Sequence, residues 1–324
     1  MSNTPVENRM KALAIGVLLL LSAATVSAQV TPAQQAREEL ALGVQAYKSA
    51  NYDEAVEHFQ RAVLLNDDLC VAKLYLATAY AQQYVPGVEA RDNVAMANHA
   101  IDQYRATLKC DPRNVNPLKG IAFLNMQLKK FEEAKQGYRE ALKLAATDPE
   151  LYYSIGVIDW TEAYKKTTET KTRYSPLQHE ADTKNADTKN DETAGGDDSA
   201  DGDDDTGGEE SPQAGSESPI LPDDLLNLSP ACPELRSRNL PLVEDGIKML
   251  SRATELRKNY DDAMAYMNLL YRQRAEIECG DRAGSVADIK KADDWSDLAM
   301  ATRKKKAEAE EKCVKADNPA ACAK

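Results

Sequence analysis

The sequence predicts an all-α protein of paired helices, interrupted by one long acidic insertion. Small and large apolar residues recur at helical spacing with a period near 34 residues, which is typical of repeat architectures. Glycine (15) and proline (14) are too scarce in 324 residues for a collagenous or wholly disordered chain. The window 180–220 holds fourteen Asp and Glu against two lysines, a net charge of −12 out of −13 for the chain. The charge is therefore local, and the rest of the chain is close to neutral.

The first predicted element is a secretory signal at residues 1–28. Arg9 and Lys11 precede an apolar run at 12–21, and small residues follow at the −3 and −1 positions up to Ala28. This order predicts cleavage after Ala28 and export, in a bacterium to the periplasm. The apolar run is too short to span a membrane, so we do not expect the mature chain to cross one. The alternative is a buried N-terminal helix.

Residues 33–165 are predicted to hold three complete two-helix units and the first helix of a fourth. In each unit, small residues would let two antiparallel helices approach while large residues fill the space between them. The matching positions are Leu42, Gly43, Tyr52, Ala55, Phe59 and Ala62 in the first unit; Leu76, Ala77, Tyr80, Ala100, Tyr104 and Pro112 in the second; Ile121, Ala122, Phe131, Ala134, Tyr138 and Ala141 in the third; and Ile155 and Gly156 in the fourth.

The insertion is predicted as a disordered acidic linker at residues 166–230. Its low hydrophobicity, high charge, glycine and serine leave nothing to offset the entropy of ordering. Asp201, Asp203 and Asp205 alternate as in a calcium loop, but Thr206 stands where an EF-hand needs glycine. We therefore expect no metal site there.

The helical pattern resumes in residues 231–312. Gly246, Leu250 and Ala253 have the spacing of the second helix of the fourth unit. A fifth unit begins after them, although Asn268 stands where a small residue is usual, and a capping helix is predicted at 286–312. Residues 313–324 are left as a tail.

These units resemble the tetratricopeptide repeat (TPR) over about 210 of the 324 residues. "NYDEAVEHFQRAVLL" and "KFEEAKQGYREALKL" are typical second helices of that family. "AYMNLLYRQRA" and "AQQYVPGVEA" further suggest a relative among exported, uncharacterised bacterial members. The resemblance implies a solenoid of helical hairpins whose inner face, lined by the first helix of each unit, binds protein segments.

Aligned to that family, the inward positions carry aromatic and cationic side chains that could grip a partner, rings supplying area and cations orientation. The family's clamp for a C-terminal carboxylate is disfavoured, because Leu40 and Val44 occupy its first two positions. The alternative is that each inward residue is an ordinary packing or solvated residue. The partner-binding candidates are Tyr47, Lys48, Lys119, Phe123, Tyr153, Trp160 and Arg272.

Helical register also suggests how the six cysteines pair. Cys70 begins the first helix of the second unit and Cys110 ends its second helix, so antiparallel packing would bring them together. Cys279 and Cys313 are separated by the closing helix, about 40 Å at 1.5 Å per residue, too far for a disulfide. The alternative is six free thiols, buried or idle. The predicted pairs are Cys70–Cys110, Cys232–Cys279 and Cys313–Cys322.

The sequence offers no catalytic motif. It contains no Walker loop, no Gly-Xaa-Ser-Xaa-Gly, no His-Glu-Xaa-Xaa-His and no Cys-Xaa-Xaa-Cys, and its three histidines are scattered. The sequence has no basic stripe with interleaved aromatic residues, so we do not expect it to bind nucleic acid. We expect no enzyme, cofactor, metal or small-molecule substrate. Two functions remain: an exported scaffold or adaptor that holds a protein or peptide segment, and a permanent structural subunit of an envelope assembly or secretion complex.

Overall fold

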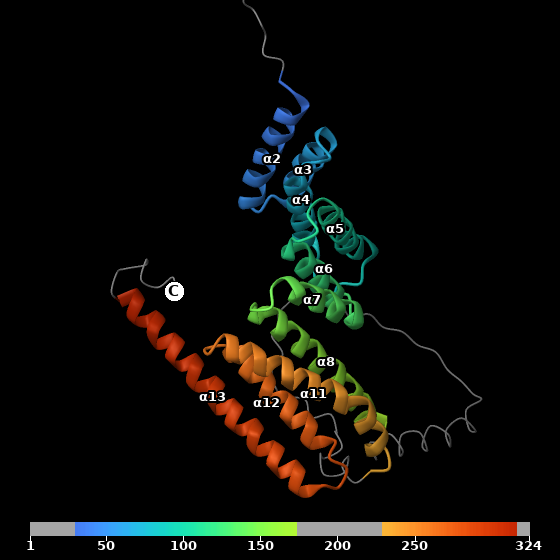
Figure 1. The fold of residues 1–324 in the computed structure, drawn as a ribbon, viewed down its shortest axis with the longest axis vertical. Coiled ribbons are helices and arrows are strands. Elements are labelled where there is room, and N and C mark those ends of the chain that lie inside the picture. Colours follow the sequence, from blue (N-terminus) through green and yellow to red (C-terminus); the bar gives the residue numbers. More distant parts are fainter. Residues whose placement is uncertain (1–29, 174–228, 316–324) are drawn as a thin grey trace, which may run out of the picture. The chain divides into compact units, whose positions relative to one another are not determined.

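The computed structural model describes residues 30–173 and 229–315, and within these ranges the chain forms ten α-helices and no strand (Figure 1). The helices fall into two compact units, residues 1–112 and 113–324. The predicted signal, most of the predicted linker, and Cys322 in the tail lie outside the described residues.

The first unit contains two helical hairpins. They are formed by α2 (Pro32–Lys48) with α3 (Tyr52–Leu65), and by α4 (Cys70–Gln83) with α5 (Arg91–Cys110). Helix α2 starts at a capping box, in which Thr31 Oγ1 accepts from the Gln34 backbone and Gln34 Oε1 accepts from the Thr31 backbone at 2.8 Å. Phe59 is the largest fully buried side chain of this unit and stacks on Tyr75 at 5.5 Å.

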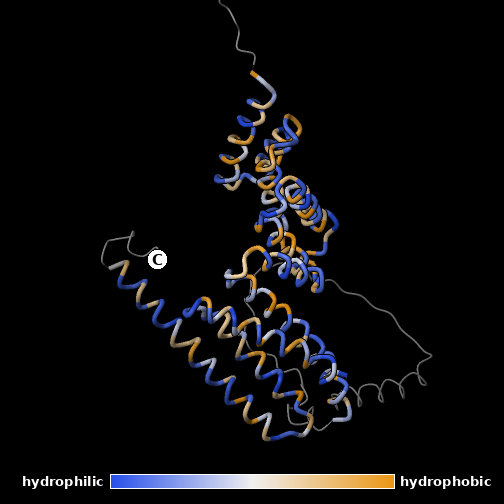
Figure 2. The backbone as a smooth tube through the Cα atoms, viewed as in Figure 1, coloured by the Kyte–Doolittle hydropathy of each residue, from blue (hydrophilic) through white to orange (hydrophobic). Residues whose placement is uncertain are grey.

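The second unit contains three hairpins, and the middle one confirms the predicted repeat across the acidic insertion. Its two helices are separated in sequence by residues 174–228 and pack along each other (Figure 1). The hairpins are α6 (Val115–Gln127) with α7 (Phe131–Leu144), α8 (Pro149–Arg173) with α11 (Cys232–Leu256), and α12 (Asp261–Glu276) with α13 (Arg282–Lys315). Apolar and hydrophilic positions alternate along the helices, as a single covered face per helix requires (Figure 2).

Helix α11 begins at Cys232, within one residue of the predicted start at 231. Two predicted boundaries are wrong, and the first is the end of α8, which continues to Arg173 and does not end at 165. Hydrogen bonds hold the last turns of α8: the buried side-chain amide of Asn239 donates to Ala163 O and to Thr167 Oγ1, both at 2.9 Å. A segment held by hydrogen bonds lacks the apolar pattern from which helices are predicted. Helix α13 also extends past 312, so Cys313 lies in the helix and not in the tail.

Glycines let the paired helices approach closely. A methyl group at Gly43 would lie 2.5 Å from the Phe59 ring, and one at Gly156 would lie 2.6 Å from Leu250 Cγ. At Gly246 it would lie 2.8 Å from Leu270. Real methyl groups do not come this near to a neighbour, so these positions accept no larger side chain without movement of the core.

Replacing Gly156 by alanine should therefore lower the free energy of unfolding of the second unit by about 1–3 kcal/mol, through overpacking against Leu250. Both tryptophans of the chain, Trp160 and Trp295, lie in this unit, so their fluorescence during denaturation reports on it alone. In a Leu250→Ala background, the cost of Gly156→Ala should be smaller, because the clashing side chain is gone. Equal costs in both backgrounds would contradict the close-approach argument.

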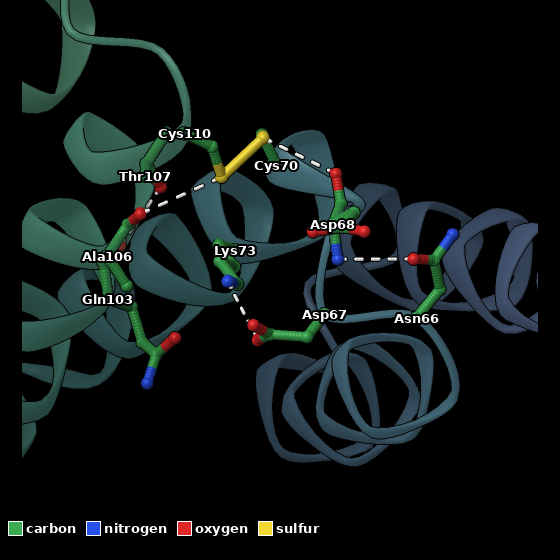
Figure 3. The surroundings of a disulfide bond; sticks show 9 residues. All are labelled: Asn66, Asp67, Asp68, Cys70, Lys73, Gln103, Ala106, Thr107 and Cys110. Atoms are coloured by element: carbon green, nitrogen blue, oxygen red, sulfur yellow. Dashed lines mark hydrogen bonds and ion pairs between the residues drawn. A yellow bond between two sulfur atoms is a disulfide. The ribbon is translucent and has the colours of Figure 1, made fainter.

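Two of the predicted disulfides are present. Cys70 at the start of α4 bonds Cys110 at the end of α5, with Cα atoms 5.9 Å apart (Figure 3). Cys232 at the start of α11 bonds Cys279, which follows α12, with Cα atoms 5.5 Å apart. Each bond joins the open end of two antiparallel helices. The third predicted pair cannot be compared, because Cys322 lies outside the described residues.

Changing both Cys70 and Cys110 to serine should destabilise the α4–α5 hairpin by about 2–4 kcal/mol, the usual effect of opening a loop of some tens of residues. Faster amide hydrogen exchange in α4 and α5 would report the loss. Denaturation followed by tryptophan fluorescence should not change, because both tryptophans belong to the second unit. Unchanged exchange in α4 and α5 would show that the bond does not stabilise the hairpin.

Candidate functional site

In the first unit, one predicted inward residue, Tyr47, packs partly within the chain. The ring of Tyr47 is half-buried, meets Tyr52 edge-on at 5.3 Å, and packs against the core around Phe59. Burial raises the pKa of its hydroxyl. Its neighbour Lys48 is exposed. Whether either touches a partner stays a prediction.

In the second unit, two predicted cations are already paired within the chain. Lys119 Nζ lies 2.9 Å from Asp148 Oδ2, and Arg272 Nη2 lies 2.7 Å from Asp293 Oδ1 on α13. Phe123 on α6 is different, because 46% of it is exposed. Phe123 is therefore an apolar side chain of the predicted set that remains accessible to a partner.

Two further predicted residues, Tyr153 and Trp160 of α8, are brought together by Tyr266 of α12. The Tyr266 ring meets Tyr153 at 5.8 Å and Trp160 at 5.3 Å, edge-on in both cases. Trp160 then stacks on Tyr164 at 5.1 Å. We call these four residues, Tyr153, Tyr266, Trp160 and Tyr164, the aromatic row. Each contact lies within the range in which aromatic pairs attract.

The row starts from a fixed support. Tyr153 packs at 5.0 Å on Tyr260, which is only 5% exposed. Tyr260 donates its hydroxyl to Glu150 at 2.6 Å, and Arg257 both pairs with Glu150 at 2.6 Å and lies 4.3 Å above the Tyr260 ring. These contacts hold one end of the row in place. The other end, Tyr164, is 51% exposed.

The polar edges of the row are unused. Within the described residues, the hydroxyls of Tyr153, Tyr266 and Tyr164 and the indole N–H of Trp160 make no hydrogen bond, and none of them is sealed from solvent. Burial raises the pKa of both Tyr153 and Tyr266, and the carboxylate of Asp262 raises them further. The hydroxyls therefore remain protonated, and able to donate, throughout the neutral range.

Sequence reasoning missed half of this row. Tyr164 lies within the predicted helix and shares a face with Tyr153 and Trp160, eleven and four residues before it, but it was not among the predicted residues. Tyr266 comes from another helix, and spacing along one helix cannot reveal it. The helical spacing alone could have identified Tyr164.

A buried charge cluster lies on α7 and α8. Lys135 Nζ contacts Glu162 at 2.6 Å, Glu132 at 3.1 Å and Asp159 at 3.2 Å, while the second carboxylate oxygen of Asp159 has no partner. Burial raises the pKa of Asp159 to about 7, against the opposing charge of Lys135. Burial alone would lower the pKa of Lys135, but its three carboxylates outweigh this and raise it. With Lys135 and Asp159 both under 5% exposed, the cluster joins helices and offers no open site.

The Asp159 carboxyl should make stability depend on pH. Its pKa is higher in the folded chain than in the unfolded one, so the folded state holds the proton more tightly, and the contribution is lost as pH rises from about 4 to about 7. The charges of Lys135 and Arg139 of α7 lower this pKa, and the charge of Asp245 of α11 raises it, without reversing the effect of burial. Asp159→Asn removes this titration. As pH rises from 4.5 to 8, the unfolding free energy of the wild type should fall relative to that of the variant. A constant difference between the two proteins would contradict the assignment of this titration to Asp159.

The described helices show two further absences. No group of three or more His, Cys, Asp or Glu in them could hold a metal ion. Among the same residues, no helix is long and apolar enough to cross a membrane.

Comparison with known proteins finds likeness in structure only. No family model matches the sequence, and no curated protein does. Similar solved structures include the MamA protein of Desulfovibrio magneticus (10% identity, 84% of this chain and 96% of that one, TM-score 0.48). They also include YrrB, a TPR protein with an unusual peptide-binding site (11%, 82% and 90%, TM-score 0.44), and a thermophilic TPR protein of Thermus thermophilus (13%, 83% and 97%, TM-score 0.36). With every TM-score below 0.5, these matches lend no argument about function.

The fold class follows from the helices of this structure and not from the comparisons. Helix order and pairing confirm the predicted tetratricopeptide-type hairpins, from the first pair α2–α3 to the last pair α12–α13. In the second unit, α8 and α12 are the first helices of consecutive hairpins and lie in contact. The aromatic row thus lies on the first helices of two consecutive hairpins.

Proposed function

We propose that this chain of tetratricopeptide-type hairpins is an exported protein-binding scaffold that holds a segment of a partner protein. The aromatic row carries the proposal. Rings already ordered by their neighbours lose little side-chain entropy when a partner covers them, so most of the apolar contact energy is available for binding. Aromatic anchors of this kind supply much of the affinity at protein interfaces.

The charges around the row fit an adaptor better than a catalyst. The titratable groups near it are either paired, as Arg257 and Glu150 are, or tyrosines whose raised pKa keeps them neutral. None of these combines a nucleophile with a base. Phe123 on α6 offers a second apolar contact in the same unit. Lys48 and Tyr47 would contribute to binding from the first unit.

Export is supported by the two disulfides. Bonds such as Cys70–Cys110 and Cys232–Cys279 persist in oxidising compartments and are rare in the cytosol. The periplasm, reached through a signal cleaved after Ala28, is the compartment we propose. The acidic residues 180–220 would serve as a solvated tether between α8 and α11.

Replacing Trp160 by alanine should weaken capture of the partner by on the order of 2 kcal/mol, because the side chain that joins Tyr164 to Tyr266 is lost. Phe123→Ala should have a smaller effect in the same direction. A photo-crosslinking residue at position 164 would identify the partner in the envelope fraction, and binding of that partner to each variant would then be measured.

Leu64→Ala is the matched control, because Leu64 is an apolar side chain, 87% exposed, on a helix of the first unit. It should leave binding unchanged. Full binding by Trp160→Ala with Phe123→Ala would place the contact elsewhere. Size exclusion of a native extract separates the scaffold from the alternative function, because a permanent subunit would elute wholly in a large complex.

A further inference from the structure

We propose that the segment held by the aromatic row is proline-rich, binds as a polyproline II helix, and carries a basic residue at one end. This inference rests on the proposed function and specifies its ligand. The aromatic row, its unused hydrogen-bond donors and the carboxylate of Asp262 beside it each point to that chemistry.

The first argument is the shape of the row. Four rings follow one another at centroid distances of 5.8, 5.3 and 5.1 Å, three of them from α8 and one, Tyr266, from α12. A polyproline II helix rises about 3.1 Å per residue and presents rigid pyrrolidine rings at regular intervals, so several prolines can each meet an aromatic ring. It is already extended before binding, and little conformational entropy is lost.

The second argument is hydrogen bonding. Three hydroxyls and one indole N–H of the row can donate and have no partner in the described part of the chain. A proline-rich segment has free carbonyl oxygens and few N–H groups, which is the complementary set. An amphipathic helix satisfies its own carbonyls internally, and on this surface it would cover the donors without pairing them, at a cost in free energy.

The third argument is charge. The carboxylate of Asp262, 58% exposed, stands one helical turn before Tyr266 on α12, so the two side chains share a face at that end of the row. Its present partner is Arg303 at 3.1 Å, which also binds Asp261 and can keep that second carboxylate. A basic residue of the ligand can therefore pair with Asp262. This fixes the direction in which the segment lies.

The test uses the chain from Gln29 onward and three labelled peptides of twelve residues, measured by fluorescence anisotropy. The first repeats Pro-Pro-Xaa and ends in one arginine. The second replaces each proline by alanine, which removes the polyproline II preference and favours a helix, and the third replaces the arginine by glutamate. We expect the first peptide to bind at least 10-fold more tightly than the second, and several-fold more tightly than the third.

Variants then locate the site. Tyr164→Phe with Tyr266→Phe removes only hydroxyls and should weaken the proline-rich peptide about 3- to 10-fold per lost hydrogen bond. Trp160→Ala should weaken it more, and Leu64→Ala should leave it unchanged. Tyr164→Ala provides a second truncation at a half-exposed position, where folding is not at risk.

Equal or tighter binding of the alanine peptide would overturn the inference, and so would proline-rich binding that survives both Trp160→Ala and Tyr164→Ala. These outcomes differ from failure of the proposed function. If the natural partner is still lost in Trp160→Ala while the proline-rich peptide never binds, the scaffold role stands and the ligand class is wrong. If substitutions in the aromatic row change neither the binding of the natural partner nor that of the proline-rich peptide, both proposals fail.

Discussion

The close approach of paired helices is the constraint on which this structure depends. At Gly156 and Gly246 there is room for a hydrogen atom and nothing larger, because Leu250 and Leu270 fill the space a methyl group would need. Helices that approach so closely can bury their large side chains against each other's backbones, and these side chains form the core between the helices. Deleting the glycine–leucine contact would separate the layers, and every contact farther along the hairpins would change with it.

The candidate site depends on the same constraint. Tyr153, Trp160 and Tyr164 lie on α8, which also carries Gly156 and is held against α11. Tyr266 lies on α12, which packs against both α11 and α8. A shift of α11 by the width of one methyl group would alter the α8–α12 spacing and separate the rings. The buried network around Lys135 and Asp159 also holds α8 to α7, so two neighbouring helices fix the position of α8.

How far the sequence predicts this structure depends on what kind of contact holds each part. The hairpins are predictable because small and large residues repeat, as with Gly43 and Phe59, and the cysteine pairs follow once the register is known. The last turns of α8 were not predictable from apolar spacing, since they are held by Asn239 and by Lys171 with Glu276 at 3.1 Å. The aromatic row combines residues about 100 positions apart. Only the fold brings Tyr266 to Trp160.

The two disulfides have a consequence for the integrity of the chain. Cys70–Cys110 lies wholly before the acidic window and Cys232–Cys279 wholly after it, so neither bond crosses residues 174–228. A single cut in that window would therefore yield two polypeptides joined by no covalent bond. They would stay together through the α8–α11 contact, with Leu250 against Gly156 and Asn239 against Thr167. The α8–α11 hairpin would then be a non-covalent interface between the two fragments. Each fragment carries part of the aromatic row.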